Sequence, residues 1–457
     1  MKATVAYLGA LGREHRHPRH AIPPLRAAYA ASVLRAAGHD VELLDTAAPN
    51  AARLDLAAHI TRRRPDLLVA DARIETVDQV ATLARAVRAH CGAIIAAGPP
   101  AEALAADVLA EESVRGVLGG EYEGWIGGVA ESLAAGAPPL APGWVTRGAS
   151  GPFTAQAAVP IADIDALPTP AHAELLAGGY TVAYPVQRRD RLRCAYVLST
   201  RGCPHACTFC SPVEMRSRFL PYRVRDVEAV ADELAQVARL GANVVYFNDD
   251  NFLRDRARVT ALCEAILRRR LDLTWLADAR ADDVDPTLLP LMRRAGCSTL
   301  CLGVESGSQR VLDAMRKGIT VEQTRAAAAA IHAAGLWMVA YVILGSPGET
   351  EAERHATWRL LDDIRPELVQ CHRFAWYPMA RGERGDPSWR RPSHKFATDS
   401  TGAPPLAFDQ RELYRRFYLS PRFLLHYART RARWLPGPIL RDAALAWRTA
   451  TYLLGAR

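Results

Sequence analysis

Short apolar segments alternate with longer helical patterns over the first 135 residues, and this alternation constrains the fold more than any other feature of the chain. Such an alternation is typical of βα units that are joined by short loops. Five units predict an open, doubly wound parallel sheet of the Rossmann or flavodoxin type, with its ligand crevice beyond the carboxyl ends of the strands. The strands are expected at Ala3–Leu8, Val41–Leu44, Leu67–Ala70, Ala93–Ala97 and Gly116–Leu118.

A second alternation follows a stretch, residues 136–188, that is rich in Pro, Gly and Ala and has no sustained periodicity. We interpret that stretch as a linker. From 189 to 376, strands again alternate with helices and predict a partial (β/α)6 barrel, whose chemistry belongs on the loops after the strands. In residues 377–457 the pattern stops, and a loop-rich segment with a small helical tail is expected to supply substrate contacts and to pack across the barrel mouth.

Composition narrows the class of protein. The chain has 457 residues, of which 49% are hydrophobic, and it contains no apolar run long enough to span a bilayer. Its nine cysteines, an odd number at irregular spacing, do not form a disulfide framework, so a reducing, cytoplasmic location is expected. The net charge of +8 comes from arginines spread along the whole chain, which argues against a nucleic-acid partner.

Three cysteines lie close together in the segment Cys203-Pro-His-Ala-Cys207-Thr-Phe-Cys210. Three thiolates can hold three corners of a [4Fe–4S] cluster, and no fourth cysteine stands nearby to take the last iron. A structural zinc site is the alternative, but it needs a fourth Cys or His at a regular spacing. We therefore predict a cluster with one open iron.

The segment Ser199–Ser211 resembles the cluster loop of radical S-adenosylmethionine (SAM) enzymes. The resemblance implies that the open iron chelates the amino and carboxylate groups of SAM. An electron from the cluster then cleaves SAM to a 5′-deoxyadenosyl radical, so a donor such as flavodoxin or ferredoxin is expected as a partner. Phe209 is implied as a neighbour of the adenine. A purely electron-transferring iron–sulfur protein would not need the further SAM motifs that follow.

Two strand ends of the barrel carry the first candidate SAM contacts. The resemblance assigns Asp249 and Asp250, in Phe247-Asn-Asp-Asp-Asn-Phe252, to the amino group of SAM or to a substrate amine or hydroxyl. Helix capping is the alternative for this pair, since Asp is a preferred N-cap residue. Arg280 can pair with the methionyl carboxylate in a bidentate fashion, with a surface position as the alternative.

Two later motifs resemble the same family. Glu305 and Ser306, in Gly303-Val-Glu-Ser-Gly-Ser308, are implied to hydrogen-bond the ribose or the methionyl part of SAM. Gly345, after another strand, is expected to let the adenine approach the backbone. Lys317-Gly-Ile-Thr320 is interpreted as the start of a helix that Thr320 and Gln323 cap.

Three N-terminal segments, Ile22–Asp45, Ala96–Pro100 and Gly119–Glu123, resemble the cobalamin-binding domain that precedes many radical SAM barrels. There is no DxHxxG motif, so cobalamin would bind base-off without a histidine ligand. The alternative is a domain that kept its fold and lost its corrinoid. The implied cobalamin contacts are Arg73, which is expected to face the metal, with Gly98, Gly120 and Glu121.

Two functions are compatible with this pattern. The first is cobalamin-dependent C-methylation of a natural-product intermediate in bacterial secondary metabolism, such as antibiotic biosynthesis. The second is a cobalamin-independent radical dehydration of an aminoglycoside or sugar-like diol, for which Asp249 and Asp250 would suit a polycationic substrate. Tyr222 or Glu214 would then protonate the leaving hydroxyl as a general acid. The sequence alone does not name the substrate.

Overall fold

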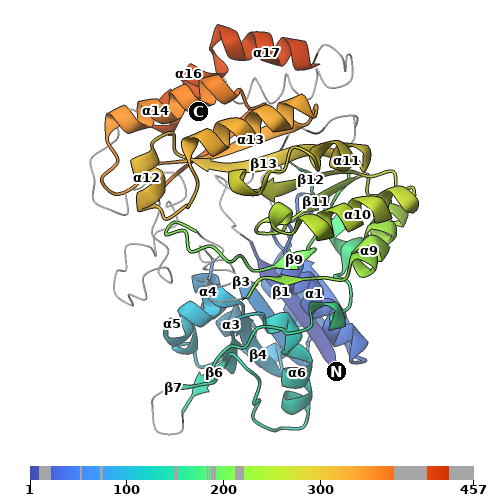
Figure 1. Ribbon diagram of the computed structural model, residues 1–457. Helices are drawn as coiled ribbons and strands as arrows, with labels where there is room; N and C mark the ends of the chain where they lie inside the picture. Colours follow the sequence, from blue (N-terminus) through green and yellow to red (C-terminus); the bar gives the residue numbers. More distant parts are fainter. Residues whose placement is uncertain are drawn as a thin grey trace.

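The computed structural model describes residues 1–9, 22–51, 54–72, 76–148, 153–182, 184, 186, 192–210, 221–374 and 409–431. It contains two large sheets (Figure 1), the N-terminal one in the lower half of the view and the second one above it. The C-terminal helices lie on the side of the second sheet that faces away from the N-terminal domain.

The N-terminal sheet has the predicted doubly wound topology. Its seven strands run in the order β2-β1-β3-β4-β5-β6-β7, and the first five pair in parallel. The central strands β1 and β3 are almost wholly buried, because helices cover both faces of the sheet. The five parallel strands lie close to their predicted bounds: β1 (Lys2–Leu8), β2 (Asp40–Asp45), β3 (Leu67–Ala72), β4 (Ala93–Ala97) and β5 (Gly116–Leu118).

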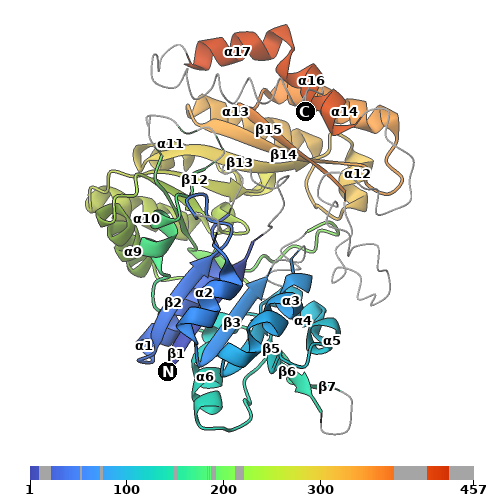
Figure 2. The ribbon, with the colours of Figure 1, turned by 180° about the vertical axis from the view of Figure 1, so that it is seen from behind.

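Separate hydrophobic cores lie on the two faces of this sheet. Val5 and Val69 point into a core under α1 and α6 (Figure 1), and their neighbours Ala6 and Leu68 point into another core under α2 and α3 (Figure 2). This is the alternation expected of strands whose successive side chains face opposite sides. The helices are α1 (Leu25–Ala36), α2 (Leu56–Arg63), α3 (Asp78–Val87), α4 (Pro99–Ala103), α5 (Ala105–Leu109) and α6 (Ile126–Ala134).

The expected linker contains regular structure. β6 (Trp144–Arg147) and β7 (Phe153–Ala155) extend the N-terminal sheet as antiparallel strands, and α7 (His172–Ala177) follows them. With four and three residues, these strands are too short to produce a periodic pattern among the surrounding Pro and Gly residues.

The second sheet is the predicted partial barrel. Its six strands are all parallel and run in the order β15-β14-β13-β12-β11-β8. They are β8 (Cys194–Val197), β11 (Val244–Phe247), β12 (Thr274–Ala279), β13 (Cys297–Glu305), β14 (Trp337–Leu344) and β15 (Leu368–Arg373). The helices between them are α9 (Val227–Arg239), α10 (Arg256–Arg268), α11 (Leu289–Arg294), α12 (Gln309–Ala314), α13 (Val321–Ala333) and α14 (Glu351–Ile364).

The two faces of the barrel sheet differ. Outward side chains such as Phe247 and Leu302 pack in one large core with the covering helices. Inward side chains such as Tyr246 and Cys301 belong to a separate cluster, which also contains Tyr29 and other residues of α1. Helix α1 of the N-terminal domain therefore closes part of the inner face of the barrel.

Two short elements join at the cysteine loop. β9 (Thr200–Arg201) lies before the loop and β10 (Arg223–Val224) lies after it, and they pair antiparallel. Single turns of 3-10 helix occur at Arg88–His90, Tyr122–Gly124, Ile164–Ala166, Phe252–Arg254 and Ala281–Asp283.

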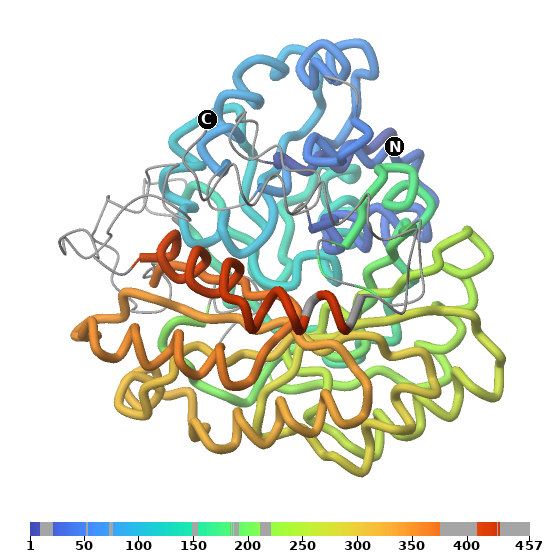
Figure 3. Tube along the Cα trace, turned by 90° about the horizontal axis from the view of Figure 1, so that it is seen from above, coloured from blue at the N-terminus to red at the C-terminus, as the bar shows by residue number. Residues whose placement is uncertain are grey.

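The described C-terminal helices cover the edge strand β15 rather than the barrel mouth. Figure 3 shows them beside the segment that holds α14 and β15. From α16 (Gln410–Tyr418), Tyr418 and Tyr414 use their hydroxyls to accept the amides of Val369 and Cys371 at 2.9 and 2.8 Å. These bonds satisfy backbone groups that an edge strand leaves open. α17 (Pro421–Arg431) follows, and no helix within the described ranges is long and apolar enough to cross a membrane.

Candidate active site

The cysteine loop begins directly after β9 and lies against two other loops of the barrel. Thr208 donates two hydrogen bonds to the carbonyl oxygen of Met315, from its amide at 2.9 Å and from its hydroxyl at 3.3 Å. Arg280, which follows β12, points a guanidinium nitrogen at the Cys207 sulfur at 3.7 Å. The loop therefore lies at the carboxyl ends of the barrel strands, where chemistry is expected.

The three thiols of this loop are electrostatic neighbours. Burial raises the pKa of Cys210, and the charges of Cys207 and Cys203 raise it further. Burial is also the main cause of the raised pKa of Cys203, to which Asp250 and Cys207 add. No three His, Cys, Asp or Glu side chains in the described part of the chain surround a single metal ion, as a mononuclear zinc site would require. Thiolates of an iron–sulfur cluster do not need to converge in this way, because each one binds a different iron.

Arg280 is a buried and firmly held cation. Its guanidinium binds the carboxylate of Asp282 through two bonds of 2.9 and 3.0 Å and donates to the carbonyl oxygen of Lys317 at 2.6 Å. With 5% exposure, it does not have the surface position that the sequence left open. The remaining nitrogen points at Cys207, so Arg280 holds the cluster loop, and its contact with SAM stays a prediction.

Lys317, which the sequence indicated only as part of a helix start, is a buried site residue. Its ammonium pairs with Glu305 Oε1 at 2.7 Å and lies 5.7 Å from the centre of the Phe209 ring. A Cβ at Gly303 would stand 2.6 Å from both charged groups, so only glycine leaves room for the pair. Glu305 adopts φ +59°, in the left-handed region that is uncommon for non-glycine residues. The pair forms a fixed polar wall beside Phe209.

Ser306 and Gly345 occupy two neighbouring strand ends. The Ser306 hydroxyl is buried 3.3 Å from the Thr357 hydroxyl, which ties β13 to α14. Gly345 has φ +83° and donates its amide to Glu349 Oε2 at 2.6 Å. Burial raises the pKa of Glu349 to about 7, and its Oε1 has no hydrogen-bond partner among the described residues. The SAM contacts of Ser306 and Gly345 stay predictions.

Asp249 is occupied by the chain itself. Its carboxylate accepts the amides of Ser199 at 2.7 Å and Thr200 at 3.2 Å, and also the Ser199 hydroxyl. Burial raises its pKa, and the charge of nearby Arg258 opposes this. Asp249 therefore fixes the entry to the cluster loop, and its predicted contact with SAM stays a prediction, whereas the capping alternative is wrong. Asp255 caps α10 instead.

Asp250 acts on the loop thiols, because its charge adds to the rise that burial causes in the pKa of Cys203 and of Cys210. Tyr222 follows the loop and lies beside Arg258, whose charge opposes the rise that burial causes in the tyrosine pKa. Glu214 lies outside the described residues. The general-acid role of Tyr222 or Glu214 stays a prediction.

The inner face of the barrel carries a polar network that the sequence analysis did not identify. Asp278 Oδ1 accepts the hydroxyl of Tyr246 at 2.7 Å and lies 3.0 Å from the hydroxyl of Tyr341. The Tyr341 hydroxyl lies 2.9 Å from that of Tyr184, which donates to Gln370 Oε1 at 2.6 Å. Burial raises the pKa of all three tyrosines. Two strands, β11 and β14, and the linker thus direct hydroxyls toward a carboxylate on β12 and an amide on β15.

This network leads to the cysteine loop. Asp278 and Arg280 are two residues apart on β12 and its end, so both face inward with Leu276. The signal in the sequence was a single carboxylate in the apolar strand Thr274–Ala279, at the register of an inward position. The inner face below the cluster loop is therefore the candidate substrate-binding face.

A buried carboxylate lies at the carboxyl end of β3. Asp71 is 2% exposed, and its Oδ2 accepts the Tyr122 hydroxyl at 2.8 Å, whereas Oδ1 has no hydrogen-bond partner within the described ranges. Burial raises its pKa to about 6, against the opposing charge of Arg26. Gly98, at φ +97°, would bring a Cβ within 3.2 Å of Asp71 Oδ1. Arg73 lies outside the described residues.

The turn after β5 contacts both α4 of its own domain and the barrel domain. Gly120 has φ +60° and donates its amide to Glu102 Oε2 at 2.8 Å. Glu121, predicted as a cobalamin contact, instead binds Arg201 and Arg223 of the barrel domain. Its carboxylate is therefore used at the domain interface, and its contact with cobalamin stays a prediction.

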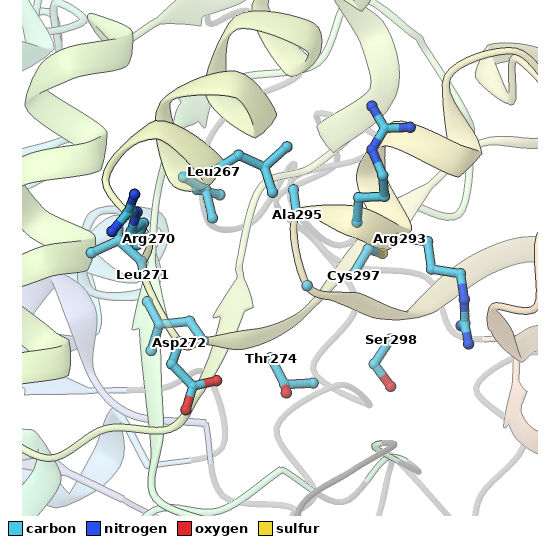
Figure 4. A pocket seen from close by; sticks show the side chains of 13 residues that line it. Leu267, Arg270, Leu271, Asp272, Thr274, Arg293, Ala295, Cys297 and Ser298 are labelled. Atoms are coloured by element: carbon cyan, nitrogen blue, oxygen red, sulfur yellow. The ribbon is translucent and has the colours of Figure 1, made fainter.

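A cavity of about 540 Å³ opens at the opposite end of the barrel strands (Figure 4). It is bordered by the amino ends of β12 and β13, and Arg270, Asp272 and Arg293 line its wall. Parallel barrels carry their chemistry at the carboxyl ends of the strands, so we do not assign this cavity to the active site.

The residues present fit the two predicted metal cofactors. Three neighbouring thiols beside a guanidinium are a suitable donor set for a [4Fe–4S] cluster with one open iron. At the N-terminal crevice, the free Oδ1 of Asp71 is a buried acceptor for amide N–H groups, which a corrinoid carries on its rim. Gly98 and Gly120 leave the backbone there accessible.

Two family models match the chain. The radical SAM superfamily model matches residues 197–361, from β8 through most of α14. The B12 binding domain model matches residues 16–125, which contain most of the N-terminal sheet.

Several curated proteins are similar in sequence. An uncharacterized methyltransferase of Pyrococcus horikoshii is 27% identical over 79% of this chain and 77% of its own length. The anaerobic magnesium-protoporphyrin IX monomethyl ester cyclase of Rubrivivax gelatinosus is 29% identical over 49% of this chain, and the chain spans only 42% of that relative. The bacteriochlorophyllide d C-12(1)-methyltransferase of Chlorobaculum tepidum is 28% identical over 38% of each chain.

Two solved structures share the fold. OxsB, a cobalamin-dependent SAM radical enzyme solved with aqua-cobalamin and SAM, superposes with a TM-score of 0.65 at 18% identity, over 79% of this chain and 52% of that one. The radical SAM methyltransferase TsrM of Kitasatospora setae, solved with tryptophan and a SAM analogue, gives 0.63 at 19% identity, over 83% and 75%.

The cobalamin-independent dehydratase and a role in antibiotic biosynthesis gain no support from these relatives. The N-terminal part and the barrel part each match the family model of one domain of the same two-domain architecture. The two sheets have the topologies that these domains require. The chain therefore belongs to the radical SAM superfamily, in the group with an N-terminal B12-binding domain, and is a cobalamin-dependent enzyme that uses a [4Fe–4S] cluster and SAM.

Proposed function

We propose that this enzyme is a methyltransferase that places a methyl group on an unactivated carbon of a small-molecule substrate. The observation that carries the proposal is the direct junction of a B12-binding domain with the cysteine loop of a radical SAM barrel. When bound, the cluster and SAM supply a carbon-centred radical that removes hydrogen, and cobalamin supplies the methyl group. Two sequence relatives and one structural relative that carry the name methyltransferase support this choice.

The positions of the chain's own residues fit a reaction in which one cofactor removes hydrogen and the other supplies the methyl group. The loop thiols lie at one end of the inner face of the barrel, and Tyr29 of α1 packs into the apolar part of that face. A buried face of this kind keeps water away, which protects a radical from side reactions. Asp278, with the hydroxyls of Tyr246 and Tyr341, offers a polar anchor that orients a substrate carrying N–H or O–H groups.

The substrate and the electron donor belong to the same proposal. The inner-face network is enclosed by strands and by α1, which favours a small molecule such as a natural-product intermediate over a nucleic acid. The reduced cluster needs electrons from outside the chain, and a flavodoxin or ferredoxin is the expected class of donor.

The test uses SAM labelled in its methyl group. The anaerobically reconstituted protein, with hydroxocobalamin and a reductant, is expected to form both 5′-deoxyadenosine and S-adenosylhomocysteine, and to hold up to one labelled methyl per cobalamin. Without cobalamin, only 5′-deoxyadenosine is expected, because the methyl group then has no acceptor. A protein that retains cobalt and cleaves SAM, yet forms no S-adenosylhomocysteine, would refute methyl transfer.

A further inference from the structure

Both ends of the cysteine loop are bound to one carboxylate of the N-terminal domain. Arg201, two residues before Cys203, places Nη1 3.2 Å from Glu121 Oε1. Arg223, after the loop, donates to both oxygens of Glu121, at 2.7 Å to Oε2 and at 2.9 Å to Oε1. The two arginines are paired opposite each other in the β9–β10 ladder. Glu121 therefore joins the entry and the exit of the loop.

The contact is buried and balanced in charge. Glu121 and Arg201 are each 5% exposed, and Arg201 also pairs with Glu123 at 2.6 Å, so two acids face two arginines. The Arg201 guanidinium lies 5.2 Å from the centre of the Tyr29 ring. Buried ion pairs gain little stability over apolar contacts, and their best attested use is to fix one arrangement among several.

A third segment completes the contact. The amide of Ile161, in the linker, donates to Glu121 Oε2 at 2.8 Å, and its carbonyl oxygen accepts a bond from Arg223. Because every one of these bonds is directional, the carboxylate fixes the N-terminal domain, the linker and the cysteine loop relative to one another.

Glu121 also stands next to the cobalamin crevice. It directly follows Gly119 and Gly120, which form the turn at the carboxyl end of β5. That turn is held from the other side by Glu102, and a Cβ at Gly119 would stand 2.4 Å from the Glu102 carboxylate. A ligand in the crevice that orders this turn therefore also orders the carboxylate that grips the loop.

We propose that Glu121, Arg201 and Arg223 form an interdomain clamp that couples cobalamin binding to the conformation of the cluster loop. The clamp residues are positioning residues, and the inference rests on the proposed function only in taking cobalamin and the cluster as the two cofactors. Coupling between two binding events is reciprocal, so an assembled cluster raises the affinity for cobalamin by the same factor as bound cobalamin raises the affinity for the cluster.

The test measures hydroxocobalamin binding to the full-length protein with and without the reconstituted cluster. In the wild type, the cluster is expected to lower the dissociation constant about 5- to 150-fold, the usual range for coupled sites. In Glu121→Gln, which keeps the shape and removes the charge, this ratio is expected to fall to within about twofold of one. Amide exchange in residues 199–203 and 221–226 should then no longer slow when cobalamin binds.

Two further variants make the test specific. Glu111→Gln makes the same change at an acid of this domain that pairs with the exposed Arg85, away from the interface, and should keep the wild-type ratio. Arg223→Lys keeps the charge but loses the two-pronged bond, so an intermediate ratio is expected, and it decides the question if Glu121→Gln does not fold. A wild-type ratio near one, or an unchanged ratio in the clamp variants, overturns the clamp. Absence of methyl transfer with the ratio intact would instead refute the proposed function alone.

Discussion

The two large sheets of this enzyme are both built mainly from βα units with parallel strands, yet they use their faces differently. In the N-terminal sheet, helices and hydrophobic cores cover both faces, and the buried carboxylate Asp71 lies at a strand end. In the barrel, the helices between the strands cover only the outer face, and the inner face, which α1 of the N-terminal domain partly covers, presents Asp278 and its tyrosines. An open sheet thus confines its ligand to one edge, whereas a curled sheet can offer a whole face.

The largest expected effect separates the two cofactor sites. Cys203→Ala removes one of three cluster ligands, so iron content and 5′-deoxyadenosine formation should fall to background. Cobalamin should still bind, with the affinity of the cluster-free wild type, because the N-terminal sheet has its own cores. Iron and cobalt analysis of one sample checks both statements. Cys91→Ala, at a half-buried cysteine of the N-terminal domain, should leave the iron unchanged.

The next comparison tests whether the inner face is a ligand surface or a structural core. Leu300→Ala, on the fully buried outer face, should lower the free energy of unfolding by about 2–5 kcal/mol through the cavity that it leaves. Asp278→Asn keeps an oxygen acceptor for the tyrosines and should cost about 1 kcal/mol. Denaturant unfolding of both variants shows which of them loses more free energy of unfolding. If Asp278→Asn proved the more damaging, the inner network would be a core.

The Asp71 carboxylate, at the carboxyl end of β3, should make the free energy of unfolding depend on pH. The pKa of Asp71 is raised to about 6, above the value of about 4 in an unfolded chain, so the folded state binds the proton more tightly. This stabilisation is complete below about pH 4 and is lost as the pH rises through 6. Asp71→Asn, neutral throughout, should gain about 2 kcal/mol on the wild type between pH 4 and 7. Parallel curves from urea unfolding of the cobalamin-free proteins would contradict this.

The smallest expected effect compares alanine substitutions of two glycines, one in the cobalamin crevice and one in a helix of the same domain. Gly98→Ala should lower stability by about 1–3 kcal/mol, because φ +97° strains any side chain, and it should weaken cobalamin binding. Gly128→Ala lies in α6 with nothing within 4 Å of the added Cβ, and should stabilise by about 0.5–1 kcal/mol. Thermal unfolding and cobalamin titration of the two variants check the opposite signs.

Most of the fold was predictable because its strands and helices follow simple hydrophobic patterns. The five N-terminal strands and the barrel alternation were identified from apolar runs alone. The strands β6 and β7 were missed because they are short, and the docking of α16 was missed for a different reason. Tyr414 and Tyr418 bind the backbone of β15 through their hydroxyls, and such contacts leave no periodic trace in the sequence.

The site was only partly predictable, because a motif shows which residue types recur but not which partner each one takes. The cysteine spacing identified the cluster loop. Asp249 and Glu121 were assigned to cofactors, but their partners lie 50 and 80 residues away, at Ser199 and Arg201, and only the folded chain brings them together. The role of Asp278 could not be predicted from a single carboxylate in an apolar strand, because the tyrosines that bind it come from other strands.

The clamp has a consequence for how far the two domains can be exchanged or expressed separately. A barrel produced without residues 1–135 would keep Arg201 and Arg223 but lose Glu121 and Glu123, and it would uncover the side chains that Tyr29 now covers. Two guanidiniums that are buried by their partners would then face solvent beside an apolar patch. The barrel therefore cannot be separated from its N-terminal domain without exposing this surface. A chimera with a relative's B12-binding domain needs an acidic residue at the position of Glu121.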